Sequence, residues 1–207
     1  MDAILVELAY KKRIIKKIEK IPDKIFNDLK LAIQDKSVKH NSYLAGNIEQ
    51  EYRLDKHIPK LEKYLIDEIA NEPFLMNYMN RDYNCNTEDR LLSLTTLWVN
   101  FQKKHEFNPV HNHDGVFSFI IFLQIPYLRE EQKKISPGRN SNLECAGCVE
   151  FMYSGLMGNI ETSQFPVDKT WEQKMLIFPA KLFHCVYPFY GTDDYRITMS
   201  GNVRFKV

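Results

Sequence analysis

The sequence predicts an α+β protein that is mainly β, with a jelly-roll-like core and N-terminal helices packed on one face of it. Two observations support this fold class. Residues 1–90 place apolar side chains at helical spacing, whereas residues 91–207 contain short apolar runs separated by Gly, Pro, Asn and Asp. Helices first and strands later are typical of a sheet with helices on one face. The chain has 207 residues, which predicts a single domain over residues 1–207.

Two helices are expected in the first part of the chain. Pro22 suits the first turn of a helix. The apolar side chains that follow it fall on one stripe: Ile25, Phe26, Leu29 and Ile33. Pro59 starts the second predicted helix, whose apolar face comprises Leu61, Leu65, Ile66 and Ile69. Residues 4–21 fit either a strand or a basic helix, and residues 43–48 fit a loop or a short strand.

The second part of the chain is expected to form the β core. The predicted strands cover residues 92–100, 116–123, 148–153, 174–178, 184–187 and 195–205. The first of them suits a strand that is buried on both faces, with Trp98 as a core residue. Four aromatic side chains are expected to line the barrel: Phe119, Phe122, Phe151 and Phe178. The charged segment 128–142 contains Pro137-Gly138 and is expected to be a mobile loop near one mouth of the barrel.

Three histidines predict a metal site. His111 and His113 are one residue apart, so in a strand both side chains point to the same face. His184 lies far downstream and can join them if the intervening strands close into an antiparallel sandwich or barrel. Imidazole binds Fe, Zn, Cu and Ni well, and a few histidines on one side of an ion leave positions open for substrate.

An arginine on the next predicted strand can serve the same site. The guanidinium of Arg196 offers paired donors to a carboxylate, so it can hold an acidic cosubstrate beside the metal. Thr198 lies two residues further on and faces the same side. The alternative interpretation places Arg196 in an ion pair with Asp193 or Asp194 at the rim of the barrel.

Several stretches, in this order, resemble the Fe(II)- and 2-oxoglutarate-dependent oxygenases, most closely the small members seen in marine phages and bacteria. The resemblance covers roughly residues 92–205. Its matching stretches are Trp98-Val99-Asn100-Phe101, Asn108-Pro109-Val110-His111-Asn112-His113, Ser118-Phe119, Phe178-Pro179-Ala180-Lys181-Leu182-Phe183-His184, Val186-Tyr187-Pro188-Phe189 and Arg196-Ile197-Thr198-Met199-Ser200-Gly201-Asn202. It implies a double-stranded β-helix core, which is cupin-like, with Fe(II) as cofactor and 2-oxoglutarate as cosubstrate.

The resemblance also implies roles for individual residues. His111 would be the first metal ligand, His184 the distal ligand, and Arg196 the partner of the 2-oxoglutarate C5 carboxylate. The Thr198 hydroxyl could reach the same carboxylate, and Asn100 could donate to the C1 carboxylate or orient a ligand.

The second metal ligand departs from the pattern of the superfamily, which has an aspartate or glutamate two residues after the first histidine. Here that position is His113, and Asp114 follows it. An all-histidine site with His113 as ligand needs no irregular backbone and is preferred. The alternative is a bulge at Gly115 that turns Asp114 inward.

The function predicted from these features is an Fe(II)- and 2-oxoglutarate-dependent dioxygenase that hydroxylates a substrate and releases succinate and CO2. Two alternatives stay open: a cupin-like all-histidine dioxygenase that does not use 2-oxoglutarate, and a non-catalytic metal-binding barrel. A peptide side chain or a small metabolite is favoured as substrate over nucleic acid, because the net charge is only +1.

Composition and cysteine content predict the cellular compartment of the protein. The N-terminal stretch is too short and too acidic for a signal peptide, and no apolar run is long enough to cross a membrane. The cysteines at positions 85, 145, 148 and 185 are too few for a disulfide framework and suit a reducing compartment. We therefore expect a cytoplasmic protein, in the host cytoplasm if it is viral. The pair Cys145 and Cys148 is interpreted as two thiols at a strand entrance rather than as half a zinc site.

Overall fold

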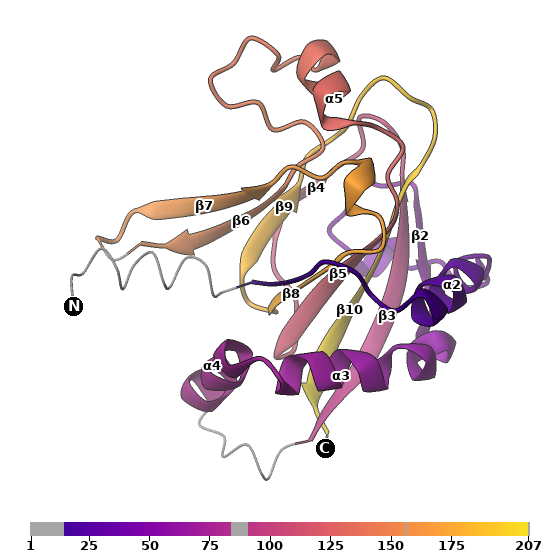
Figure 1. Cartoon of the computed structure of the whole chain (residues 1–207), viewed down its shortest axis with the longest axis vertical. Coiled ribbons are helices and arrows are strands. Elements are labelled where there is room, and N and C mark those ends of the chain that lie inside the picture. The colour runs from indigo at the N-terminus through magenta and orange to yellow at the C-terminus, as the bar shows by residue number, and fades with distance from the viewer. Residues whose placement is uncertain (1–14, 84–90, 156, 207) are drawn as a thin grey trace.

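The computed structural model describes residues 15–83, 91–155 and 157–206. Two antiparallel sheets face each other (Figure 1). The larger sheet has the strand order β1-β8-β5-β10-β3-β2 and the smaller one the order β4-β9-β6-β7. The strands are β1 (Lys16–Ile18), β2 (Gln50–Arg53), β3 (Leu92–Gln102), β4 (Asn108–His111), β5 (Phe117–Gln124), β6 (Val149–Ser154), β7 (Ile160–Phe165), β8 (Met175–Pro179), β9 (Phe183–Val186) and β10 (Arg196–Phe205). This arrangement confirms the predicted double-stranded β-helix core.

Helices from the N-terminal part cover the outer face of the larger sheet, as predicted (Figure 1). The α-helices of this part are α2 (Asp23–Ala32), α3 (Glu62–Ala70) and α4 (Pro73–Tyr83). Leu29, Leu65 and Ile69 are fully buried, so the expected apolar stripes face the core. Both predicted starts were slightly wrong. Pro22 is the N-cap of α2, and Pro59 lies inside a 3₁₀ helix (Asp55–Lys60) that precedes α3.

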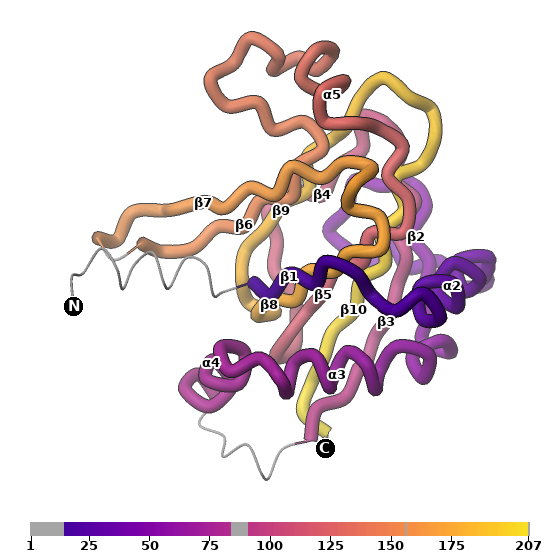
Figure 2. Tube along the Cα trace, in the orientation of Figure 1, coloured from indigo at the N-terminus to yellow at the C-terminus, as the bar shows by residue number. Residues whose placement is uncertain are grey.

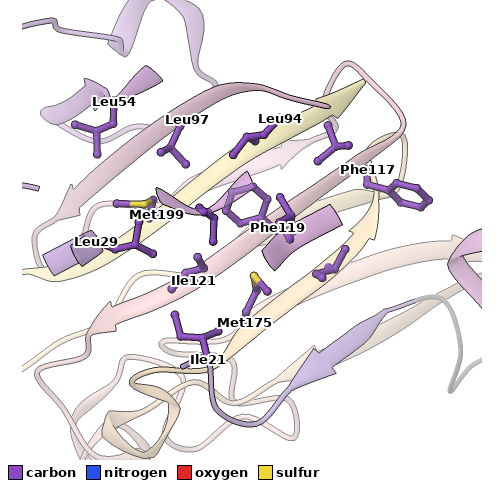
Figure 3. Packing of buried hydrophobic residues seen from close by; sticks show 14 of the residues in the cluster. Ile21, Leu29, Leu54, Leu94, Leu97, Phe117, Phe119, Ile121, Met175 and Met199 are labelled. Carbon is purple, nitrogen blue, oxygen red and sulfur yellow. The ribbon is translucent and has the colours of Figure 1, made fainter. Parts of the chain in front are cut away.

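The larger sheet is buried on both faces, and each face has its own apolar cluster. The outer cluster packs Leu97, Phe119, Ile121, Met175 and Met199 against the helices (Figure 3). The inner cluster lies between the sheets and contains Phe122, Phe151 and Phe178. The prediction that Phe119 lines the barrel was therefore wrong. Phe119 and Phe122 are an odd number of residues apart in one strand, so they point to opposite faces.

Other segments differ from the prediction. The segment predicted as a mobile loop contains the helix α5 (Arg129–Ile135), whose first turn is acidic and last turn basic. The stretch that was ambiguous between strand and helix contributes β1, which pairs with β8 (Figure 2). Residues 1–14 and Cys85 lie outside the described residues. None of the helices in the described part of the chain is both long and apolar enough to cross a membrane.

Candidate metal and cosubstrate site

A polar cavity of about 180 Å³ lies between the two sheets. The three histidines line its wall together with polar side chains from the inner face of the larger sheet. These polar residues are Glu51, Asn100, Gln102, Arg196, Thr198 and Ser200. They share one face because side chains alternate along β2, β3 and β10. The cavity therefore interrupts an otherwise apolar interior.

The β4–β9 pair brings the distal histidine to the first one. His111 is the last residue of β4, and its Cα partner across the strand pair is His184 of β9. His113 lies just beyond the end of β4, where its backbone N–H donates to the carbonyl of Ala180 at 2.8 Å. The potential ligand atoms of the three histidines all lie within 4.8 Å of one another. The sequence-based expectation that these residues meet is thus realised, although of the pair His111 and His113 only His111 lies in a strand.

The backbone orients two of the three imidazoles. Nδ1–H of His111 donates to the carbonyl of Pro109 at 2.7 Å, and Nδ1–H of His184 donates to the carbonyl of Leu182 at 3.0 Å. In both rings Nε2 then carries the free lone pair. Histidine ligands in metal sites commonly donate a hydrogen bond from the other ring nitrogen, which fixes the tautomer.

Burial keeps these imidazoles neutral. It lowers the pKa of His113 to about 2 and that of His184 to about 3, and the neighbouring imidazoles add to both shifts. Burial also lowers the pKa of His111. Neutral imidazole is the form that binds a metal, and nitrogen donors suit Fe(II). The donor set therefore fits an iron ion with open positions.

Asp114 lies apart from this group. Its side chain is 78% exposed and its carboxylate pairs with Lys181 at 3.2 Å. Gly115 has a positive φ of 104°, but the turn it makes does not bring Asp114 inward. The group of potential ligands in the described part of the chain consists of the three histidines alone.

Arg196 is buried in the same cavity wall without a carboxylate partner in the described part of the chain. Its exposed fraction is 1%, and its Nη1 donates to the Tyr127 hydroxyl at 3.2 Å and to the Gly147 carbonyl at 3.1 Å. Nε of Arg196 has no hydrogen-bond partner within residues 15–83, 91–155 and 157–206. The alternative ion pair with Asp193 or Asp194 is not found. Asp193 pairs with Lys104 instead.

Thr198 and Asn100 accompany Arg196 as expected. They are Cα partners across β10 and β3, and both line the cavity. The Oδ1 atom of Asn100 is buried and has no hydrogen-bond partner in the portion of the chain that the structure describes. Trp98, predicted as a core residue, is buried but also borders the site, with its ring centroid 5.5 Å from that of His113.

Two features of the site were missed at the level of sequence. Tyr127 holds Arg196, and Glu51 is a buried acid on the cavity wall. Burial, with a smaller contribution from the charge of Glu106, raises the pKa of Glu51 to about 8. The sequence carries no clear signal for Glu51, because burial does not alternate along β2: both Glu51 and Tyr52 are buried.

Comparisons with known proteins agree with this geometry. Residues 96–202, just over half of the chain, match the model of the family described as "Putative 2OG-Fe(II) oxygenase". The sequence has no significant match among curated proteins.

Solved structures share the fold at low sequence identity. AviO1 from Streptomyces viridochromogenes has a TM-score of 0.53 and 12% identity, covering 95% of this chain and 94% of its own. The non-heme α-ketoglutarate-dependent epimerase SnoN from nogalamycin biosynthesis has a TM-score of 0.51 and 14% identity, covering 97% and 81%. A 2OG-Fe(II) oxygenase family oxidoreductase from Burkholderia pseudomallei has a TM-score of 0.50 and 9% identity, covering 99% and 90%.

Proposed function

Since the chain belongs to this family of 2OG-Fe(II) oxygenases, we propose that it is a dioxygenase that hydroxylates an organic substrate. The family uses Fe(II), with 2-oxoglutarate and O2 as cosubstrates. In the proposed reaction one oxygen atom of O2 enters a C–H bond of the substrate. The other enters succinate as 2-oxoglutarate loses CO2.

One observation carries the proposal beyond family membership. Arg196 is a permanent cation, buried in the cavity that the three histidines line, and its only polar partners in the described part of the chain are neutral. A buried charge without a counter-ion is costly. A dicarboxylic acid would remove that cost by placing one carboxylate on the guanidinium and its other end at the metal.

We assign the metal ligands to His111, His113 and His184. When bound there, Fe(II) would supply the redox chemistry with O2 that protein side chains lack. The contribution of this chain is to hold three neutral imidazoles in place and to exclude water. Phe151 and Phe178 serve the second purpose, because their ring centroids lie 5.5 and 4.9 Å from that of His184.

We assign the cosubstrate site to Arg196, Thr198 and Asn100. Tyr127 and the Gly147 carbonyl fix the guanidinium in the wall, so that little reorganisation is needed when a carboxylate arrives. Thr198 adds a hydroxyl donor next to the arginine, and Asn100 adds an amide on the neighbouring strand.

The reaction type is the finer part of the proposal. SnoN, which shares the fold, is described as an epimerase, so the same scaffold is compatible with outcomes other than hydroxylation. We favour hydroxylation of a peptide side chain or a small metabolite, in keeping with the low net charge.

The test is succinate formation from 2-oxoglutarate under O2, measured with and without Fe(II). We expect Fe(II)-dependent succinate from the wild-type protein, none from His184→Ala, and strongly reduced formation at low 2-oxoglutarate from Arg196→Ala. An Asp114→Ala variant is the matched control, because that carboxylate is exposed and paired with Lys181. Absence of 2-oxoglutarate turnover and binding in wild-type protein would contradict the proposal and favour a cupin-like dioxygenase or a binding protein.

A further inference from the structure

The cavity holds a second cluster of buried polar atoms near β2, two strands away from the strand that carries Arg196. Three side-chain oxygens in its wall have no hydrogen-bond partner among the described residues: Oε1 of Glu51, Oδ1 of Asn100 and Oδ1 of Asn108. Buried polar atoms are nearly always paired in folded proteins, so a group of three unpaired acceptors in one cavity needs an explanation. All three would be satisfied by hydrogen-bond donors.

Glu51 is the centre of this cluster. Its exposed fraction is 1%, and no lysine or arginine of the described ranges pairs with it. The amide of Asn41 donates to Oε2 at 3.3 Å, which orients the carboxyl group and leaves Oε1 free on the cavity side. The chain thus holds an acid in place inside the protein without a counter-ion.

Gly46 keeps the space beside these oxygens open. A Cβ atom at this position would lie 2.7 Å from Oε1 of Glu51 and 2.7 Å from Oδ1 of Asn108. Any larger residue would therefore fill the space next to both acceptors. Both oxygens therefore lie beside the Gly46 backbone and close to each other in the cavity wall.

Asn100 borders both this cluster and the proposed cosubstrate site, whereas Glu51 lies away from Arg196. Glu51 is the Cα partner of Asn100, which is in turn the partner of Thr198 beside Arg196. Neighbouring strands are about 4.8 Å apart, so Glu51 lies about 10 Å from Thr198 across the sheet. When Arg196 holds a carboxylate, Glu51 remains available to bind another molecule. The cavity is thus positive at one end and acidic at the other.

We infer that Glu51 and Asn108 form the recognition subsite for a positively charged nitrogen of the substrate, an ammonium or a guanidinium group. Such a group supplies donors to both acceptors, and its positive charge favours the ionised form of Glu51, whose pKa is raised to about 8 in its absence. A neutral donor would supply only the hydrogen bonds. The inference rests on the proposed function, because it assigns the group to the substrate of that reaction.

The experiment uses small probes, so that the whole substrate need not be known. Protein is loaded with Zn(II), which undergoes no redox chemistry, and with 2-oxoglutarate. Ligand-observed NMR then measures the dissociation constants of methylguanidinium and butylammonium against their neutral counterparts, methylurea and butanol. We expect each cation to bind about tenfold more tightly than its counterpart.

Variants locate that preference. Glu51→Gln should reduce the difference between cation and counterpart to within about twofold, since it removes the charge but keeps the shape. Glu49→Gln is the matched control, because Glu49 is exposed, lies two residues away and pairs with Lys103, and it should keep the full difference. Equal binding of charged and neutral probes by wild-type protein, or a preference that survives in Glu51→Gln, would overturn the assignment. Displacement of the probes by Mg²⁺ or Ca²⁺ would overturn it in favour of a metal-ion site.

The two proposals fail in different ways. Binding of 2-oxoglutarate is titrated in the same wild-type sample. If 2-oxoglutarate binds and no cation is preferred, only the assignment of Glu51 is wrong. If 2-oxoglutarate does not bind, the proposed function fails, whatever the probes do.

Discussion

His111 and His184 are Cα partners across the antiparallel β4–β9 pair, and their imidazole centroids lie 4.3 Å apart. The ring of His113 reaches the same place from beyond the end of β4, with its centroid 5.0 Å from both. Register in a strand pair is specified by the packing of both faces. The distance between the two candidate ligands is therefore a property of the core and does not depend on a flexible loop.

This arrangement favours His113 over Asp114 as the second metal ligand, which mutation can test. His113→Ala should weaken Fe(II) binding by more than about 100-fold, because even the outer partners of metal ligands are worth about 10- to 100-fold. Asp114→Ala should leave the affinity within about twofold, since its carboxylate is exposed and pairs with Lys181. Anaerobic titration of Fe(II) compares the two variants. The reverse ranking would show that Asp114 turns inward and binds the metal.

Glu51 should make stability depend on pH in a recognisable way. Its pKa is raised from an ordinary 4.5 to about 8 by burial. Below pH 4.5 the carboxyl is protonated in both folded and unfolded states and costs nothing. As the pH rises to 8, only the unfolded state loses the proton, so folding is disfavoured by at most about 1.4 kcal/mol per pH unit. Above pH 8 the penalty is constant.

Glu51→Gln isolates this effect. We expect the variant to be more stable than the wild type, by a margin that grows from pH 5 to pH 8 in thermal or urea unfolding of metal-free protein. Glu49→Gln should show no such growth, because its carboxylate is exposed. A margin independent of pH would mean that Glu51 ionises normally in the folded protein.

Local patterns were sufficient to predict the histidines and the arginine of the candidate site. Arg196 falls in the predicted strand 195–205 and His184 begins the predicted strand 184–187. His111 was marked by its spacing from His113, since period two puts both on one face of a strand. Turn residues separated most strands correctly. Whether these residues act as assigned stays a prediction, as does the single-domain organisation over residues 1–207.

The residues that were missed depend on contacts between distant segments. Tyr127 follows a strand and meets Arg196 only because β5 and β10 are neighbours. Glu51 is on a strand of four residues, too short for its periodicity to be read. β7 is an edge strand with few apolar residues, so neither face carries a hydrophobic pattern. Tertiary packing determines all three.

Tyr127 should act on the cosubstrate through Arg196. Tyr127→Phe removes one hydrogen bond to Nη1, a loss of about 0.5–1.5 kcal/mol, so 2-oxoglutarate should bind roughly two- to tenfold more weakly. Fe(II) affinity should not change, because Tyr127 does not contact the histidines. Calorimetric titration separates the two constants. Tyr187→Phe is the control, since that hydroxyl donates to Glu150, which does not line the cavity. Equal loss of both affinities would indicate a general disturbance of the fold instead.

Arg196 provides the most direct test of the cosubstrate site. Loss of a charge-assisted contact to a carboxylate in a buried site costs about 2–5 kcal/mol. Arg196→Ala should therefore weaken 2-oxoglutarate about thirty-fold or more while Fe(II) still binds. Arg196→Lys should restore only part of the affinity, because an ammonium cannot present two parallel donors.

The melting temperature provides a second measurement of how Arg196 affects 2-oxoglutarate binding. A ligand that binds only the folded state raises its melting temperature, so 2-oxoglutarate should stabilise metal-loaded wild type and fail to stabilise Arg196→Ala. Arg81→Ala removes the same charge from the surface of α4, where Arg81 pairs with Asp82, and should behave like wild type. An affinity of Arg196→Ala within threefold of wild type would mean that this buried guanidinium does not hold the carboxylate. The strongest residue-level support for a 2-oxoglutarate enzyme would then be lost.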